Sequence, residues 1–157
     1  MTQKSHSCPE CGCLLGKARS LPDHRRFFGL IRKATDQWPL THPFQPADEH
    51  QLRAFLLVEA NYCDVDFIPA PDECGTNPAI LALFRSSVEA AYSAVTRRCG
   101  YAFLRVTISG AEILTPRSID FATLDQKAFG PLREAVEGII EGSIGVPSEQ
   151  LLREQAA

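Results

Sequence analysis

The residues best suited to bind a metal lie near the N-terminus. Cys8 and Cys11 are two residues apart, with Pro9 and Gly12 shaping the turn so that both thiolates can face one ion, as in a zinc knuckle. A structural zinc site takes four ligands, and the sequence has no second Cys-x-x-Cys pair. The other ligands would come from a partner chain or from this chain, whose candidates are Cys13, His6, His24, Cys63 and Cys74. We predict a zinc site of Cys8, Cys11, Cys13 and His24, with reduced, metal-free cysteines as the alternative.

A second group of residues could bind phosphates. Between Lys17 and Lys33 there are six cations and a single carboxylate, Asp23. Helical spacing from about residue 21 to 38 places an apolar stripe on one side and cations on the other, which is one way to present a helix to nucleic acid. The alternative is a solvated polar face. The apolar stripe comprises Phe27, Leu30, Ile31, Ala34 and Trp38, and the cations are Arg25, Arg26, Arg32 and Lys33.

Three further patterns allow other chemistry. A short strand at residues 64–69 would place Asp64 and Asp66 on one face, as in a metal-dependent nuclease, but no third carboxylate is positioned by the sequence. Cys63 or Cys74 could serve a thiol enzyme, although neither has an evident histidine partner. An acidic helix could dock on a basic host protein through Glu134, Glu137 and Glu141, or could be an ordinary solvated face.

Composition narrows these choices. The net charge of −3 does not indicate a general polyanion binder, and neither a nucleophile elbow nor a phosphate-binding loop is present. The sequence lacks both a membrane-span-length apolar run and the apolar region of a signal peptide, so we expect a cytoplasmic protein of the host cell. A non-enzymatic role is therefore favoured.

Capping and turn signals predict the elements that position these residues. The helices are expected near residues 21–38, 48–63, 78–99 and 126–141, with strands at 64–69, 101–108 and 111–115. Their order predicts an α+β fold with helices packed on a small antiparallel sheet. We expect an N-terminal cysteine knuckle or arm at 1–18, one α+β domain at 19–147 and a helical tail at 148–157.

Particular residues are expected to bound these helices. Ser20 is the predicted N-cap of the first helix, and a capping box over Thr123-Leu124-Asp125-Gln126 opens the last long one. Asn77 caps the third helix and Gly100 ends it in a left-handed conformation. The expected apolar face of this third helix is Ile80, Leu83, Phe84, Val88, Ala91, Tyr92 and Val95.

Two sequence motifs resemble a group of phage proteins. The start of the first helix, Arg19-Ser20-Leu21-x-x-x-Arg25, is similar to the NinB (Orf) family of phage recombination proteins. The longer run from Ser20 to Leu30 looks more like related small phage proteins of uncharacterised function, which also share the run from Pro116 to Ala122 and a helix beginning at Asp125. The resemblance covers roughly residues 19–63 and 101–141.

This resemblance implies a phage or prophage accessory protein, homodimeric and active near DNA recombination. NinB proteins bind single-stranded DNA and the host single-strand-binding protein and are not known as enzymes. The shared motifs include Arg19, Arg25, Arg26 and Arg117. With the helical cations, the predicted nucleic-acid-binding set is Arg19, His24, Arg25, Arg26, Arg32, Lys33 and Arg117. The expected function is a non-catalytic recombination or replication accessory, with an inhibitor of a host nuclease or defence complex, or a metal nuclease, as alternatives.

Overall fold

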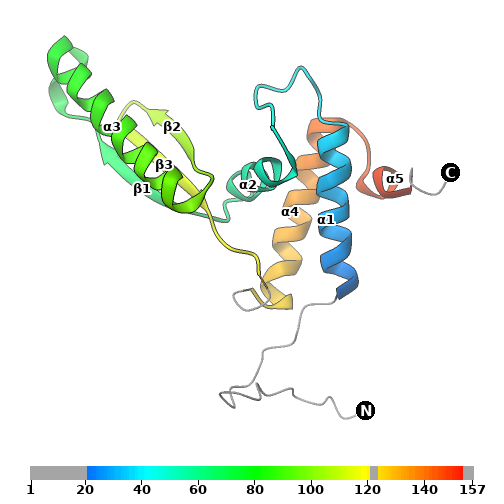
Figure 1. Ribbon diagram of the computed structural model, residues 1–157. Coiled ribbons are helices and arrows are strands. Elements are labelled where there is room, and N and C mark those ends of the chain that lie inside the picture. The colour runs from blue at the N-terminus through cyan, green and yellow to red at the C-terminus, as the bar shows by residue number, and fades with distance from the viewer. Residues whose placement is uncertain (1–20, 121–123, 154–157) are drawn as a thin grey trace, which may run out of the picture. The chain divides into compact units, whose positions relative to one another are not determined.

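The computed structural model describes residues 21–120 and 124–153 (Figure 1). The chain divides into two compact units, one made of residues 1–45 and 118–157 and the other of residues 46–117. We call them the helical unit and the sheet unit and treat each by itself. The described residues contain five α-helices and a three-stranded antiparallel sheet, which confirms the predicted α+β class and order of elements.

The helical unit contains α1 (Leu21–Asp36), α4 (Gln126–Ile144) and the short α5 (Ser148–Arg153). The helical periodicity of both long helices places one apolar stripe of each inside, where the rings of Phe27 and Phe129 meet edge to face at 5.3 Å. Leu151 of α5 is also fully buried. The predicted stripe of α1 is confirmed, because Phe27, Leu30, Ile31, Ala34 and Trp38 are all buried.

The segment that follows α1 is held by the indole of Trp38. Its Nε1–H donates to the carbonyl oxygen of Phe44 at 2.9 Å, and its ring meets that of His42 edge to face at 4.8 Å. The backbone N–H of Phe44 in turn donates to Nδ1 of His42 at 3.1 Å. Because a buried indole N–H needs an acceptor, this bond sets how the chain leaves the helix.

The sheet unit begins with α2 (Glu49–Glu59) and continues through β1 (Cys63–Pro69), a 3₁₀ turn at Asp72–Gly75 and the long α3 (Pro78–Cys99). The hairpin of β2 (Phe103–Thr107) and β3 (Gly110–Pro116) completes it. The strand order is β1-β3-β2, so both β1 and β2 are edge strands.

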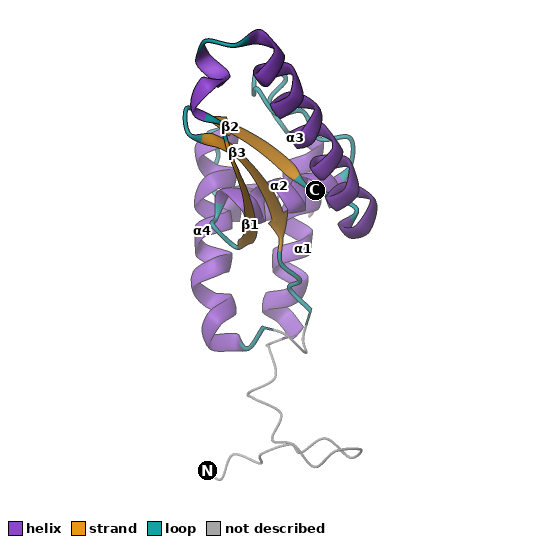
Figure 2. Ribbon diagram, turned by 90° about the vertical axis from the view of Figure 1, so that its left-hand side faces the viewer, coloured by secondary structure: helices purple, strands orange, loops and turns teal. Residues whose placement is uncertain are grey.

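The register of the sheet separates its two faces. Ala111 and Ile113 of β3 lie opposite Val106 and Leu104 of β2, and α3 covers this face (Figure 2). Leu114, Phe103 and Val65 share the opposite face, where α2 packs through a contact between the rings of Phe55 and Phe103. Val65 and Phe67 on that face remain exposed.

Gly110 is required at the start of β3. A Cβ atom there would overlap the carbonyl oxygen of Ile68 and lie 3.0 Å from the ring of Phe67. The backbone φ of Gly110 is +156°, which side-chain-bearing residues rarely adopt. The glycine thus allows β3 to pass close to β1 beneath the Phe67 ring.

The helix boundaries confirm some of the predicted caps and correct others. Asn77 caps α3 as expected, its side chain accepting from the N–H of Ala79. At α4 the cap is Asp125, which accepts from the N–H of Ala128, so the helix starts at residue 126 as expected but the predicted capping box beginning at Thr123 is wrong. Asp is as good a cap as Thr and lies directly before the helix. Gly100 has the expected positive φ of 82°, but its ψ of −52° is outside the left-handed helical region.

One prediction about the core is also wrong. Leu83 was expected on the apolar face of α3, yet its side chain is 70% exposed. The residues of α3 that contact the sheet fall within a narrow sector of the helix, and 100° per residue places Leu83 outside it. Only Val88 of this helix is fully buried.

Candidate nucleic-acid interface

The first helix carries most of the candidate residues in the described chain. Arg25 and Arg32 are exposed, and Lys33 is half-buried. Arg25 and Arg32 are seven residues apart and so lie on one side of α1, while the opposite stripe packs into the core. The buried stripe holds the helix in place and fixes the positions of these cations.

Arg26 has a structural partner. Its Nε donates to Oε1 of Glu137 on α4 at 3.5 Å. Arg133 of α4 donates to Oδ1 of Asp23 at 3.0 Å and has its Nε 3.8 Å from Oε1 of Glu137. Asp23 also accepts from Nε2 of Gln126 at 3.0 Å. These bonds tie the first turns of α1 to α4, and they engage Arg26 within the protein.

Arg25 and Lys33 differ from Arg26 in this respect. In residues 21–120 and 124–153, neither forms an ion pair with an acidic side chain. Their charges are therefore available to an anion from solution. Arg25, exposed near the helix start, is the most accessible of the group.

His24 was predicted both as a zinc ligand and as part of the nucleic-acid interface. Its ring is half-buried and lies 4.6 Å from the ring of Phe28, tilted by 53°. The other proposed zinc ligands, Cys8, Cys11 and Cys13, and the cation Arg19, lie outside the described residues. The zinc site and the contribution of Arg19 therefore stay predictions.

Arg117 belongs to the sheet unit, at the end of β3. Its Nε donates to Oδ1 of Asp64 at 2.7 Å, and both side chains are exposed. The hydrogen bond that Arg117 donates to Asp64, together with the negative charge of this carboxylate, raises the pKa of Arg117 above its ordinary value. This ion pair therefore joins the start of β1 to the residue that follows β3. The charge of Arg117 is already balanced by a carboxylate.

The metal-nuclease and thiol-enzyme alternatives receive little support from the described residues. Asp64 and Asp66 are exposed and do share one face of β1, opposite Thr115 and Ile113. However, in residues 21–120 and 124–153 no group of three or more His, Cys, Asp or Glu side chains could hold a metal ion. Burial raises the pKa of the Cys63 thiol, against the opposing effect of Arg105 and Arg117, which disfavours the reactive thiolate.

The acidic residues of α4 make contacts inside the helical unit. Glu137 pairs with Arg26 and Arg133, as described above. Glu141 accepts the backbone N–H of Ser148 at 2.7 Å, and this hydrogen bond lowers the pKa of Glu141. Glu134 is exposed and lies 4.0 Å from Arg133. Two of the three carboxylates proposed to meet a basic partner thus hold α4 and α5 in place.

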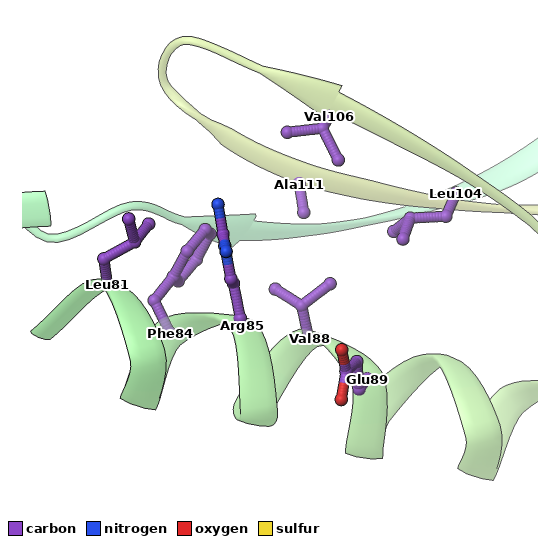
Figure 3. A pocket seen from close by; sticks show the side chains of 8 residues that line it. All are labelled: Leu81, Phe84, Arg85, Val88, Glu89, Leu104, Val106 and Ala111. Atoms are coloured by element: carbon purple, nitrogen blue, oxygen red, sulfur yellow. The ribbon is translucent and has the colours of Figure 1, made fainter. Parts of the chain in front are cut away.

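A groove between α3 and the sheet was missed by the sequence analysis. It has a volume of about 310 Å³ and is open to solvent along the β2 edge (Figure 3). Arg85 and Glu89 of α3 stand at its side. The signal that could have revealed it is the low number of charged residues between Ala79 and Thr96, because the outer side of a surface helix is normally charged.

Comparison of the chain with protein-family models, curated proteins and solved structures finds no match. Within residues 21–120 and 124–153, no helix combines the length and the apolar character needed to cross a membrane.

Proposed function

We propose that the protein is a non-catalytic accessory of phage DNA recombination or replication that holds single-stranded DNA through α1. The observation that carries this proposal is the pair of exposed cations, Arg25 and Arg32, on a helix whose opposite stripe is buried. Lys33 adds a third charge beside them. The resemblance of the α1 start to NinB proteins supplies the class of ligand.

The spacing of the cations suits a phosphate backbone. Seven residues of α-helix span about 10 Å along the helix axis, so the two arginines are too far apart to meet at one phosphate oxygen. Arg25 and Arg32 can therefore contact separate phosphates of one strand. Such contacts do not read sequence, so we expect binding with little base preference.

Binding is tested by anisotropy of a fluorescein-labelled oligo(dT) in about 20 mM salt and then at rising salt concentration. The wild type should bind, and its affinity should fall with salt. Each lost phosphate contact should reduce the slope of log K against log salt by about 0.7. Arg25→Glu and Arg32→Glu should therefore weaken binding and flatten this slope.

A matched control is Lys127→Glu, which reverses an exposed cation of α4 in the same unit. It should bind as the wild type does. Arg26→Glu is unsuitable as a test because it would also break the contact with Glu137. Absence of oligonucleotide binding by the wild type, or wild-type binding by Arg25→Glu, would exclude the DNA proposal.

The host single-strand-binding protein is the other partner that the resemblance suggests. It is tested by adding the purified host protein without DNA and measuring complex formation by sedimentation. A complex that survives Arg25→Glu in a protein that does not bind oligo(dT) would assign the function to that partner.

A further inference from the structure

The groove of the sheet unit is an apolar surface beside an open strand edge. Figure 3 shows side chains of α3 and of the hairpin pointing toward one another across it. Its apolar lining consists of Leu81, Phe84, Val88, Leu104, Val106 and Ala111. Val106 on the edge strand β2 is 71% exposed. A surface of this kind is typical of a protein contact.

The outer side of α3 continues this surface. Between Ala79 and Thr96 the only charged residues are Arg85 and Glu89. The other exposed positions in this stretch are small or apolar, namely Ala79, Ala82, Leu83, Ser86, Ser87, Ala90, Ser93 and Ala94. Depletion of charge is the compositional mark of a protein interface, and small side chains let another helix approach closely.

Arg85 and Glu89 are the two charges that a partner of α3 must match. Both are exposed, and in the described part of the chain neither is engaged in an ion pair. They are four residues apart with the cation first, which is the less favourable order for a pair within one helix. Their charges are thus open to a second molecule.

We propose that this surface binds a second copy of the chain, with the two α3 helices antiparallel about a two-fold axis that passes midway between Arg85 and Glu89, on the side of α3 that carries them. In that arrangement, residue 85 of one copy lies opposite residue 89 of the other. Arg85 then meets the partner's Glu89, and symmetry forms the same pair again. An opposite-charge pair placed evenly about the axis is therefore complementary to itself, which is the property that selects a second copy over an unrelated peptide.

The dimer also covers the apolar groove. Val106 and Leu104 lie beside Arg85 and Glu89, so the copy that contacts these charges shields the β2 edge from water. This proposal rests on the sheet unit alone and is independent of DNA binding by α1.

The charge pair provides a direct test by sedimentation equilibrium of the full chain. The wild type should have about twice the monomer mass of 17.3 kDa at about 100 µM. Arg85→Glu and Glu89→Arg should each weaken the dimer about tenfold or more, because each occurs twice and replaces attraction with repulsion. The double variant R85E/E89R should recover the wild-type dissociation constant to within about threefold.

Two further variants distinguish specific binding by this surface from nonspecific hydrophobic association. Val106→Asp places a carboxylate at the covered edge and should weaken the dimer, whereas Leu40→Asp changes an even more exposed apolar residue of the helical unit and should not. Far-UV circular dichroism checks that each variant is folded. A wild type that stays monomeric at about 100 µM, single charge variants that dimerise as the wild type does, or a double variant that fails to recover would each overturn the proposal.

Discussion

The helical unit encloses its large apolar side chains, whereas the sheet unit leaves many of its own in contact with water. In the described residues, only Leu40 of the helical unit is a strongly exposed large apolar side chain. The sheet unit exposes a larger group, comprising Val65, Phe67, Leu83, Leu104, Val106 and Ile108. Exposed apolar side chains gathered on one unit are typical of an interaction surface, which supports the proposed contact of the sheet unit with a second copy.

The two units also use charge differently. In the helical unit, Arg133 lies between two carboxylates and joins α1 to α4 with a side chain that is 23% exposed. In the sheet unit, Arg105 pairs with Glu112 at 3.3 Å on an exposed face, and its side chain is 52% exposed. Ion pairs shielded from water hold elements together more strongly than exposed pairs do.

The largest effect should come from the core of the helical unit. Phe129→Ala removes a fully buried ring that contacts Phe27, and should lower the free energy of unfolding by about 3–5 kcal/mol. Ile108→Ala at the tip of the sheet-unit hairpin should change it by about 0.5 kcal/mol or less. Urea unfolding of both variants measures the contrast, and equal losses would contradict it.

Two glycines offer the next comparison. Gly110→Ala forces a Cβ against the carbonyl oxygen of Ile68 and should destabilise the protein by about 1–3 kcal/mol. Gly138→Ala, in the middle of α4, meets no atom within 4 Å and should stabilise it by about 0.5–1 kcal/mol. The midpoint of thermal unfolding should fall for Gly110→Ala and rise for Gly138→Ala. A Gly110→Ala variant as stable as the wild type would contradict the close approach of β3 to β1.

The ion pairs should give a smaller difference. Arg133→Ala leaves Asp23 and Glu137 without their shared cation and should cost about 1–2 kcal/mol. Arg105→Ala in the sheet unit should cost about 0.5 kcal/mol or less, since its pair is exposed. Urea unfolding at low and high salt would distinguish them, and a loss from Arg105→Ala as large as that from Arg133→Ala would contradict the difference in shielding.

The smallest effect concerns pH. The backbone hydrogen bond from Ser148 lowers the pKa of Glu141 in the folded state. A lowered carboxyl pKa contributes stability above its unfolded value, and this contribution is lost as the pH falls through the lowered folded value. Glu141→Gln should therefore reduce the loss of Tm between neutral and acidic pH. Glu134→Gln is the control and should follow the wild-type pH profile.

Much of the fold was predictable because local signals and packing agree. The stripe of α1 and the cap at Asn77 each follow from residue type and spacing, and the structure confirms them. The hairpin turn is shifted by one residue from the predicted position, since β2 ends at Thr107 and Gly110 already belongs to β3. The start of β3 is set by its close approach to β1, which becomes visible only in the assembled sheet.

The candidate site was less predictable. Periodicity placed Arg25 and Arg26 together, but only the packing of α4 shows that Arg26 contacts Glu137 while Arg25 remains exposed. The exposure of Arg25 thus depends on the partners of the helix, which its own sequence does not specify. Leu83 is a different case, because it lies about 140° around α3 from the buried Val88, and the helical period alone is enough to exclude it from the core.

Trp38 also makes the protein report on its own unfolding. It is the chain's single tryptophan and is buried in the helical unit beside His42. Its intrinsic emission therefore follows that unit, whereas circular dichroism at 222 nm follows helices of both units. Coincident transitions of the two signals would mean that the units unfold together, while separated transitions would give each unit a stability of its own.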